Sequence, residues 1–116
     1  MTTHIPRYLL PHTATLSRAT GKNEWGKETL SVYTLRYVRF EPFAGRQVNI
    51  SSDMPAIRAR LFVDAENSSC EGHAPVGEYA PRAGDRVVFS GKEYVIHNVG
   101  EYYAERELHH LECELV

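Results

Sequence analysis

Apolar and polar residues alternate with a period of two along much of this chain, and this pattern predicts β-strands. The clearest segment spans residues 57–65, where every second side chain is apolar: Ile57, Ala59, Leu61 and Val63. Residues 107–116 alternate in the same way, with one face formed by His109, Leu111, Cys113 and Leu115. Neither segment has the 3.6-residue period of an amphipathic helix, so both are expected to contribute one face to a hydrophobic core.

A hairpin is predicted over residues 84–99, which read GDRVVFSGKEYVIHNV. Two runs rich in β-branched and aromatic residues, 85–89 and 93–99, flank the turn pair Ser90-Gly91. A small residue followed by glycine between two such runs is a strong short-range signal for a hairpin. We expect this ribbon to be the scaffold on which the other strands are assembled.

Two further strands are expected at residues 12–18 and 28–41. The second loses its alternating phase midway, which predicts a β-bulge near Tyr33-Thr34 or burial on both faces. Any helix is expected to be short, within residues 101–107 or in the loop that follows the strand ending near residue 65.

The fold class that follows is all-β: a small, partly open β-barrel or sandwich of about six strands. We expect a single domain over residues 1–116, in which residues 1–11 form an extended arm. Two long loops are predicted at 42–56 and 66–83, and loops of this length are often functional. Between two prolines the arm carries three large apolar residues, which would dock onto its own domain or a neighbouring subunit: Tyr8, Leu9 and Leu10.

The composition is that of a soluble globular domain, with 42% hydrophobic and 24% charged residues in a chain of 116. The formal net charge of −2 excludes an overall field that attracts nucleic acid or anionic membrane. The N-terminal segment has no apolar run that predicts a signal peptide or a membrane span.

Charge is unevenly distributed along the chain: residues 36–60 contain five arginines and two acidic residues, whereas residues 101–116 contain five glutamates and one arginine. This separation predicts either complementary partner surfaces or two solvated faces of the sheet.

Arginine outnumbers lysine ten to three, and arginine is favoured at protein interfaces because its planar group pairs and stacks readily. With the adjacent pair Tyr102-Tyr103, this bias favours an assembly protein. An alternative is a small SH3- or OB-like barrel that binds nucleic acid or another protein. That alternative would use a basic strip with interleaved aromatic residues, formed by Arg36, Arg39, Arg58 and Arg60 with Tyr37 and Phe62.

Residues that could carry chemistry are few. Cys70, His73, His109 and Cys113 have a superficially zinc-like spacing, but four residues of strand separate the last two by roughly 13 Å, too far for one ion. Asp64, Cys70 and His73 lack any nucleophile motif around the cysteine. We therefore expect no catalytic residue, no metal site and no cofactor, and a protein that is not an enzyme.

Several segments, taken in order, resemble the minor capsid and head–tail connector proteins of tailed bacteriophages. They are IPRYLLPHTATL at residues 5–16, NEWGKET at 23–29, RLFVDAENS at 60–68, PRAGDRVVFSGKEYVIHNV at 81–99 and HHLECELV at 109–116. The resemblance spans nearly the whole chain and rests on the ordered set rather than on one motif.

This resemblance implies a structural virion protein, made in the host bacterial cytoplasm, that completes the head as a ring between portal and tail. Its implied partners are portal-side and tail-side virion proteins, further copies of itself and the genomic DNA in the channel, with no membrane. Stopper proteins of this kind extend a loop into the channel, and the corresponding segment here would be Gly45, Arg46, Gln47, Val48, Asn49, Ile50, Ser51 and Ser52.

The candidate contacts with neighbouring subunits or partners lie in three places along the chain. They are the arm residues, two arginines of the third strand and the tyrosine pair: Tyr8, Leu9, Leu10, Arg58, Arg60, Tyr102 and Tyr103.

Overall fold

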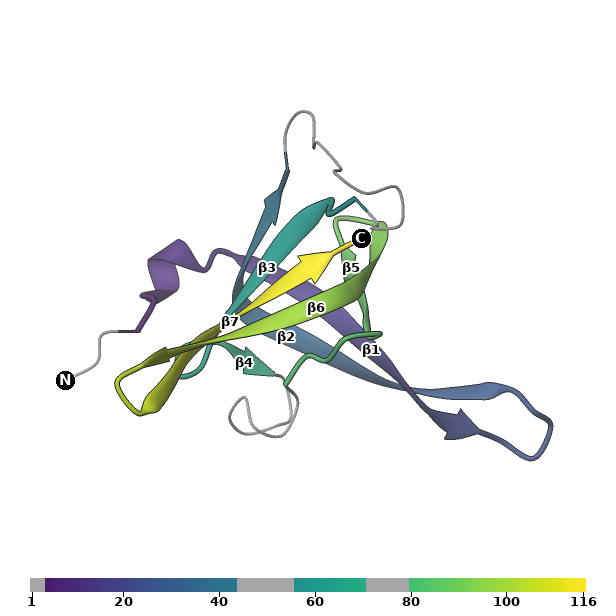
Figure 1. The fold of residues 1–116 in the computed structure, drawn as a ribbon. Helices are drawn as coiled ribbons and strands as arrows, with labels where there is room; N and C mark the ends of the chain where they lie inside the picture. Colours follow the sequence, from purple (N-terminus) through teal and green to yellow (C-terminus); the bar gives the residue numbers. More distant parts are fainter. Residues whose placement is uncertain (1–3, 44–55, 71–79) are drawn as a thin grey trace.

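The structure, a computed structural model, describes residues 4–43, 56–70 and 80–116, and these residues form one short 3-10 turn and seven strands. The turn is η1 (Arg7–Leu9). The strands are β1 (His12–Lys22), β2 (Glu28–Pro42), β3 (Ala59–Asp64), β4 (Ser69–Cys70), β5 (Arg86–Phe89), β6 (Lys92–Ala104) and β7 (Glu107–Leu115) (Figure 1). The described part of the chain contains no helix long and apolar enough to span a membrane.

All strand pairs in the sheet are antiparallel, and six strands close into a hydrogen-bonded ring. The order is β1-β5-β6-β7-β3-β2, with β1 pairing again to β2, and β4 adds to β2 as a short edge strand. The all-β prediction is therefore confirmed. The ring is not a regular barrel, because the far end of the β1–β2 hairpin pairs only with itself and projects from the body (Figure 1).

The core lies inside the ring and follows the predicted alternation. On β3 and β7 every second residue is buried, and Leu61 of β3 faces Cys113 of β7 across the ladder. Burying one leucine side chain contributes about 1.5–3 kcal/mol. The hairpin strands supply Val87, Tyr94 and Ile96 to the same cluster. This confirms that the predicted strand faces build the wall of the domain.

A β-bulge interrupts β2 at Tyr37 rather than near Tyr33-Thr34, so the predicted position was wrong. His12 pairs with Val38 and Thr13 with Arg36, which leaves Tyr37 unpaired with a left-handed φ of 57°. Its carbonyl accepts a hydrogen bond from the Ser68 hydroxyl. Because Leu35 and Val38 are both fully buried, the phase of the core face changes between them, C-terminal to the position that the alternation predicted.

Two other expectations about local structure were wrong. Residues 101–107 form no helix: β6 runs to Ala104, Glu105 adopts a left-handed φ of 60°, and β7 begins at Glu107. Ladder pairing between β6 and β7 overrides any helical tendency here. The arm is not extended throughout, because Leu9 and Leu10 donate backbone hydrogen bonds to Pro6 and Arg7 and close η1.

An ion pair links β1 to the turn that precedes β5. Arg18 donates from Nε and Nη2 to the two carboxylate oxygens of Asp85 at 3.0 and 2.8 Å. Arg18 Nη2 also donates to the Ala80 carbonyl at 2.8 Å, and the Asp85 carboxylate accepts from the Arg82 amide at 2.8 Å. The hydrogen bond to Asp85 raises the pKa of Arg18. Asp85 is buried, and this pair holds β1 against β5 where the ring closes.

Candidate functional site

The DAENS sequence after β3 forms a tight turn that holds the N-terminal arm. Asp64 Oδ2 accepts backbone hydrogen bonds from Glu66 at 3.0 Å and Asn67 at 2.8 Å, which closes the turn. Asp64 Oδ1 accepts a third, from the Ile5 amide at 2.9 Å, while the Asn67 side chain donates to the Ile5 carbonyl at 2.8 Å. Both backbone groups of Ile5 are thus bound by the turn. Residues 64–68 are therefore the docking site of the arm.

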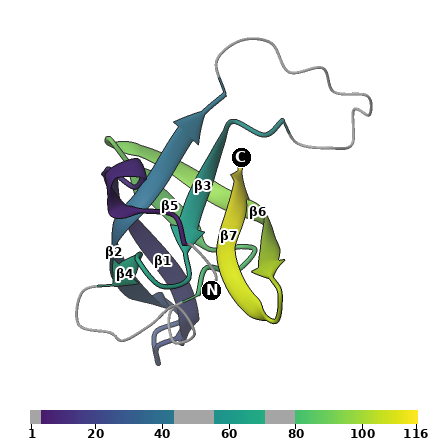
Figure 2. The same cartoon turned by 90° about the vertical axis from the view of Figure 1, so that its left-hand side faces the viewer.

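Docking separates the three apolar residues of the arm. Leu10 is only 1% exposed and packs within the domain itself. Tyr8, in contrast, is 80% exposed, and Leu9 is also exposed. Figure 2 looks at the side that carries the arm, with η1 beside β2. Tyr8 and Leu9 therefore remain available to a partner, whereas Leu10 anchors the arm.

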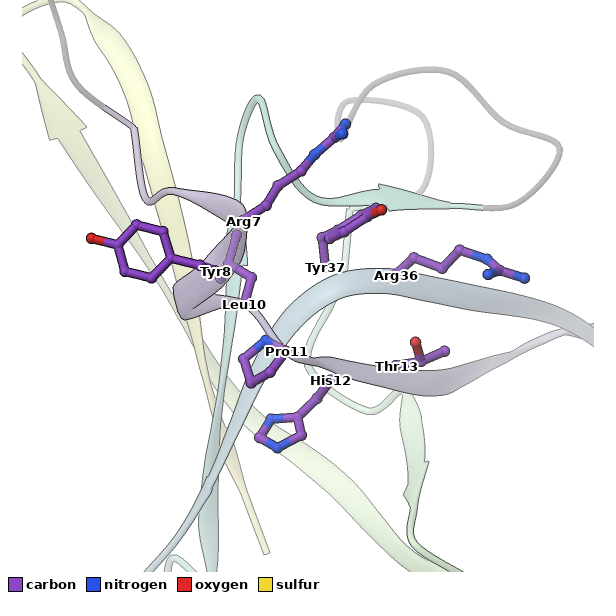
Figure 3. Close-up of a pocket in the computed structure, with 8 residues that line it drawn as sticks. All are labelled: Arg7, Tyr8, Leu10, Pro11, His12, Thr13, Arg36 and Tyr37. Carbon is purple, nitrogen blue, oxygen red and sulfur yellow. The ribbon is translucent and has the colours of Figure 1, made fainter.

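A pocket of about 340 Å³ lies between the arm and the bulge of β2 (Figure 3). The Arg7 guanidinium lies over the Tyr37 ring, 4.4 Å from its centroid. No described residue that lines the pocket is acidic, and the full lining is Arg7, Tyr8, Leu10, Pro11, His12, Thr13, Arg36 and Tyr37. Such a basic and aromatic hollow suits an anionic group or a side chain of a partner protein.

A second basic and aromatic surface lies where the chain leaves β2 and enters β3. Arg58 lies over the Tyr94 ring at 4.6 Å, and Arg60 lies over the Phe43 ring at 5.3 Å. Arg58, Tyr94 and Phe43 line a pocket of about 430 Å³ that also includes Lys92. Arg60 Nε is 3.8 Å from a carboxylate oxygen of Glu112, too long for a strong pair. The structure thus brings both predicted arginines to one surface.

The tyrosine pair lies at the end of β6, away from that surface. Tyr102 stacks on His110 with centroids 4.9 Å apart, and both tyrosines are exposed. The Tyr103 hydroxyl donates to Glu101 at 2.9 Å, and this hydrogen bond raises the pKa of Tyr103.

Residues 6–115 match the family of minor capsid proteins. The chain belongs to the minor capsid protein family of bacteriophages. No curated protein and no solved structure matches it. Membership makes the protein a virion component and supports a structural role. The resemblance to minor capsid proteins that the ordered segments indicated is thereby confirmed.

The predicted channel loop of this minor capsid protein, Gly45–Ser52, lies outside the described residues, as does His73. Cys70 and Cys113 are buried and form no disulfide bond in the described part of the chain, and burial raises the pKa of Cys113 to about 12. His109 lies beside His4 and Asp64. The Cys113 thiol therefore lies in the core, whereas His109 lies with His4 and Asp64.

Sequence reasoning missed the projecting part of the β1–β2 hairpin of the minor capsid protein. At its tip the Asn23 side chain accepts hydrogen bonds from the Trp25 and Lys27 amides at 2.9 and 3.0 Å. Trp25 is 77% exposed, and Leu30 and Val32 on β2 are exposed as well. The available signal was the turn sequence NEWGKET between two alternating runs, which predicts a hairpin longer than the core requires.

Proposed function

We propose that this minor capsid protein is a head–tail connector, a head-completion component that forms a ring between the portal and the tail. Family membership over residues 6–115 supports a structural role in the virion. The basic region and the acidic C-terminal region meet at the β3–β7 ladder, where Arg60 lies opposite Glu114 and near Glu112, so the contacts between copies in this proposal use other surfaces.

The observation that carries the connector role is the basic surface at the two ends of segment 44–55. The Phe43 amide donates to the Arg58 carbonyl at 3.0 Å, so the described residues on either side of the segment lie next to each other. Arg58 and Lys92 are exposed there, and Tyr94 supports the Arg58 guanidinium. Exposed cations beside aromatic rings suit contact with the phosphate backbone of DNA. In this proposal the surface faces the channel, and residues 45–52 close it behind the packaged DNA.

The contact between copies in the proposed ring uses the projecting hairpin. Its tip carries Trp25, and large aromatic residues are the commonest anchors of protein interfaces. A long two-stranded ribbon has little core of its own and is marginal unless something packs against it. A second copy of the chain, with the arm pocket beside Tyr8 and Tyr37 as the receiving surface, supplies that packing.

Electron microscopy of the full chain mixed with portal rings tests this proposal. We expect rings of the minor capsid protein stacked on the portal. The double variant Arg58→Ala/Lys92→Ala should still assemble but retain packaged DNA less well. Arg82→Ala/Arg106→Ala removes the same charge at exposed positions outside both the proposed channel surface and the hairpin, and is the matched control for retention. A chain that never associates with portals contradicts the connector role.

The same basic and aromatic pocket favours one alternative, in which the minor capsid protein binds nucleic acid as an SH3- or OB-like barrel and forms no connector ring. This alternative predicts a monomer that ignores portals and binds single strands with a steep salt dependence. Arg58→Ala/Lys92→Ala would then reduce the salt slope, whereas Arg82→Ala/Arg106→Ala would not.

A further inference from the structure

Three potential metal ligands from distant parts of the chain meet beneath the docked arm. They are His4 on the arm, Asp64 at the end of β3 and His109 on β7, with ligand atoms all within 4.8 Å of one another. His4 Nδ1 lies 3.3 Å from Asp64 Oδ2. The His4 side chain is 11% exposed and that of Asp64 is fully buried. Two half-buried imidazoles beside one buried carboxylate are a familiar donor set for divalent transition metals.

The Nδ1 atom of His4 has no hydrogen-bond partner among the described residues. His4 Nε2 lies 3.2 Å from a carboxylate oxygen of Glu66, to which its N–H can donate a hydrogen bond. The neutral ring then carries its lone pair on Nδ1, the atom that faces Asp64. This Nδ1 is buried and makes no hydrogen bond to any described residue. A lone pair beside a carboxylate oxygen is repulsive unless a cation lies between them, and buried polar atoms are rarely left unpartnered.

His109 is oriented by a second chain of contacts. His110 Nε2 lies 2.8 Å from Glu112 Oε2, and His110 Nδ1 lies 2.8 Å from His109 Nδ1. When His110 Nε2 donates to Glu112, its Nδ1 accepts from His109 Nδ1–H, and the lone pair of His109 is on Nε2. Carboxylate-supported histidines of this kind are typical of metal sites, because the outer hydrogen bond fixes tautomer and ring orientation.

We propose that His4, Asp64 and His109 bind one divalent transition-metal ion of the zinc type, which pins the N-terminal arm to β3 and β7. Zinc–ligand bonds of 2.0–2.2 Å place tetrahedral ligands about 3.4 Å apart. The His4–Asp64 pair already has this separation, and the remaining atoms close by rotation of the two imidazoles, which stack face to face at 5.3 Å. Three backbone amides hold the Asp64 carboxylate in place as the third ligand.

This site is independent of the connector role, but it bears on the candidate interface. The metal fixes Ile5 and η1 against the body, and with them the exposed Tyr8 and the pocket beside Arg7. Metal occupancy would thus stabilise the surface that the arm presents to a partner. The neutral thiol of buried Cys113 does not compete for the ion, because burial raises its pKa to about 12.

Cobalt(II) and zinc(II) titration of the full, tag-free chain tests the proposal. We expect one equivalent of Co²⁺ to bind with the visible absorption of a tetrahedral site and to be displaced by Zn²⁺. His4→Ala and His109→Ala should each weaken binding at least tenfold, and Glu112→Gln should weaken it about tenfold through His110. His97→Ala removes an exposed histidine of β6 and should leave the affinity unchanged.

Trypsin cleavage after Arg7 gives a second readout that does not depend on the metal spectrum. Zn²⁺ should slow this cleavage in the natural chain and in His97→Ala, but not in His4→Ala. The proposal is overturned if Co²⁺ and Zn²⁺ show no saturable binding. It is equally overturned if His4→Ala and His109→Ala, folded by circular dichroism, bind as the natural chain does. In that case a proton alone bridges His4 and Asp64.

Discussion

Two buried aspartates organise the parts of this domain that no strand pairing holds. Asp64 accepts three backbone hydrogen bonds and joins the arm to the turn after β3. Asp85 accepts from the guanidinium of Arg18 and from the Arg82 amide, and joins β1 to the turn before β5. A buried carboxylate is stable only where its lone pairs are satisfied, so each aspartate dictates the local path of the chain.

The substitution Asp85→Asn tests the ion pair. It leaves the half-buried Arg18 guanidinium without its partner charge, and losing hydrogen bonds between charged groups at this depth costs about 2 kcal/mol of unfolding free energy. Urea denaturation followed by circular dichroism measures the loss. Glu93→Gln breaks the exposed pair with Arg86, whose closest atoms are 3.7 Å apart, and should change stability by less than about 0.5 kcal/mol. Equal effects of the two variants would argue against a structural role for Asp85.

At the scale of elements, the β1–β2 hairpin has a proximal part that belongs to the core and a distal part that projects from it. Residues near Leu16 and Leu35 pack into the core, whereas the distal part beyond Arg18 pairs only within the hairpin. The exposed Trp25 at its tip contributes little to the folded state of the isolated chain. In the proposed ring, Trp25 on this projection anchors the contact with a second copy of the chain.

Trp25→Ala tests the hairpin as the contact between copies. The unfolding free energy should change by less than about 0.5 kcal/mol, as expected of an exposed position. Ring formation with portals, followed by light scattering and electron microscopy, should be lost or strongly reduced. Trp25→Phe keeps an aromatic anchor and should retain assembly. If Trp25→Ala assembles normally, the ring contact lies elsewhere.

At the scale of the whole molecule, closure of the strand ring makes the fold independent of the segment between β2 and β3. The two strands already pair from Val38–Val63 to Pro42–Ala59, and the Phe43 amide bonds the Arg58 carbonyl just beyond them. A connection that starts and ends at adjacent points can be shortened without moving either strand.

Deletion of residues 45–52 tests the predicted role of this segment. The thermal unfolding midpoint should stay close to that of the natural chain, because the ring and its core are unaffected. Retention of DNA or joining of the tail should fail in particles assembled with the deleted chain. A deletion that unfolds the domain would falsify the channel assignment, since the segment would then belong to the core.

Much of the fold was predictable, because local patterns carry it. Period-two alternation put Leu61 and Cys113 on inner faces, and the Ser90-Gly91 turn defined the β5–β6 hairpin. The bulge was misplaced because Tyr33, half-buried, continues the phase of Leu35 and hides the true break at Tyr37. The helix expected near residue 103 failed for a related reason, since pairing with β7 is not visible in the local sequence.

The candidate sites were likewise predictable from the sequence only in part. Arg58 and Arg60 were found from strand alternation, and the structure places them on one surface with Tyr94 and Phe43. Alternation along residues 57–65 places Asp64 on the face opposite Leu61 and Val63, yet its side chain is fully buried, because the arm folds back and covers it.

By itself, the amino-acid sequence determined the strands, their inner faces and the order of segments that marks the family. Those features depend on residues within a few positions of each other, where backbone geometry dictates which side chains share a face. Only the tertiary structure decided that the ring closes from β1 to β5, that Tyr37 bulges and that Leu10 is core. It also decided that His4, Asp64 and His109 meet, since residues so distant in the chain come together only when the arm docks on the finished sheet.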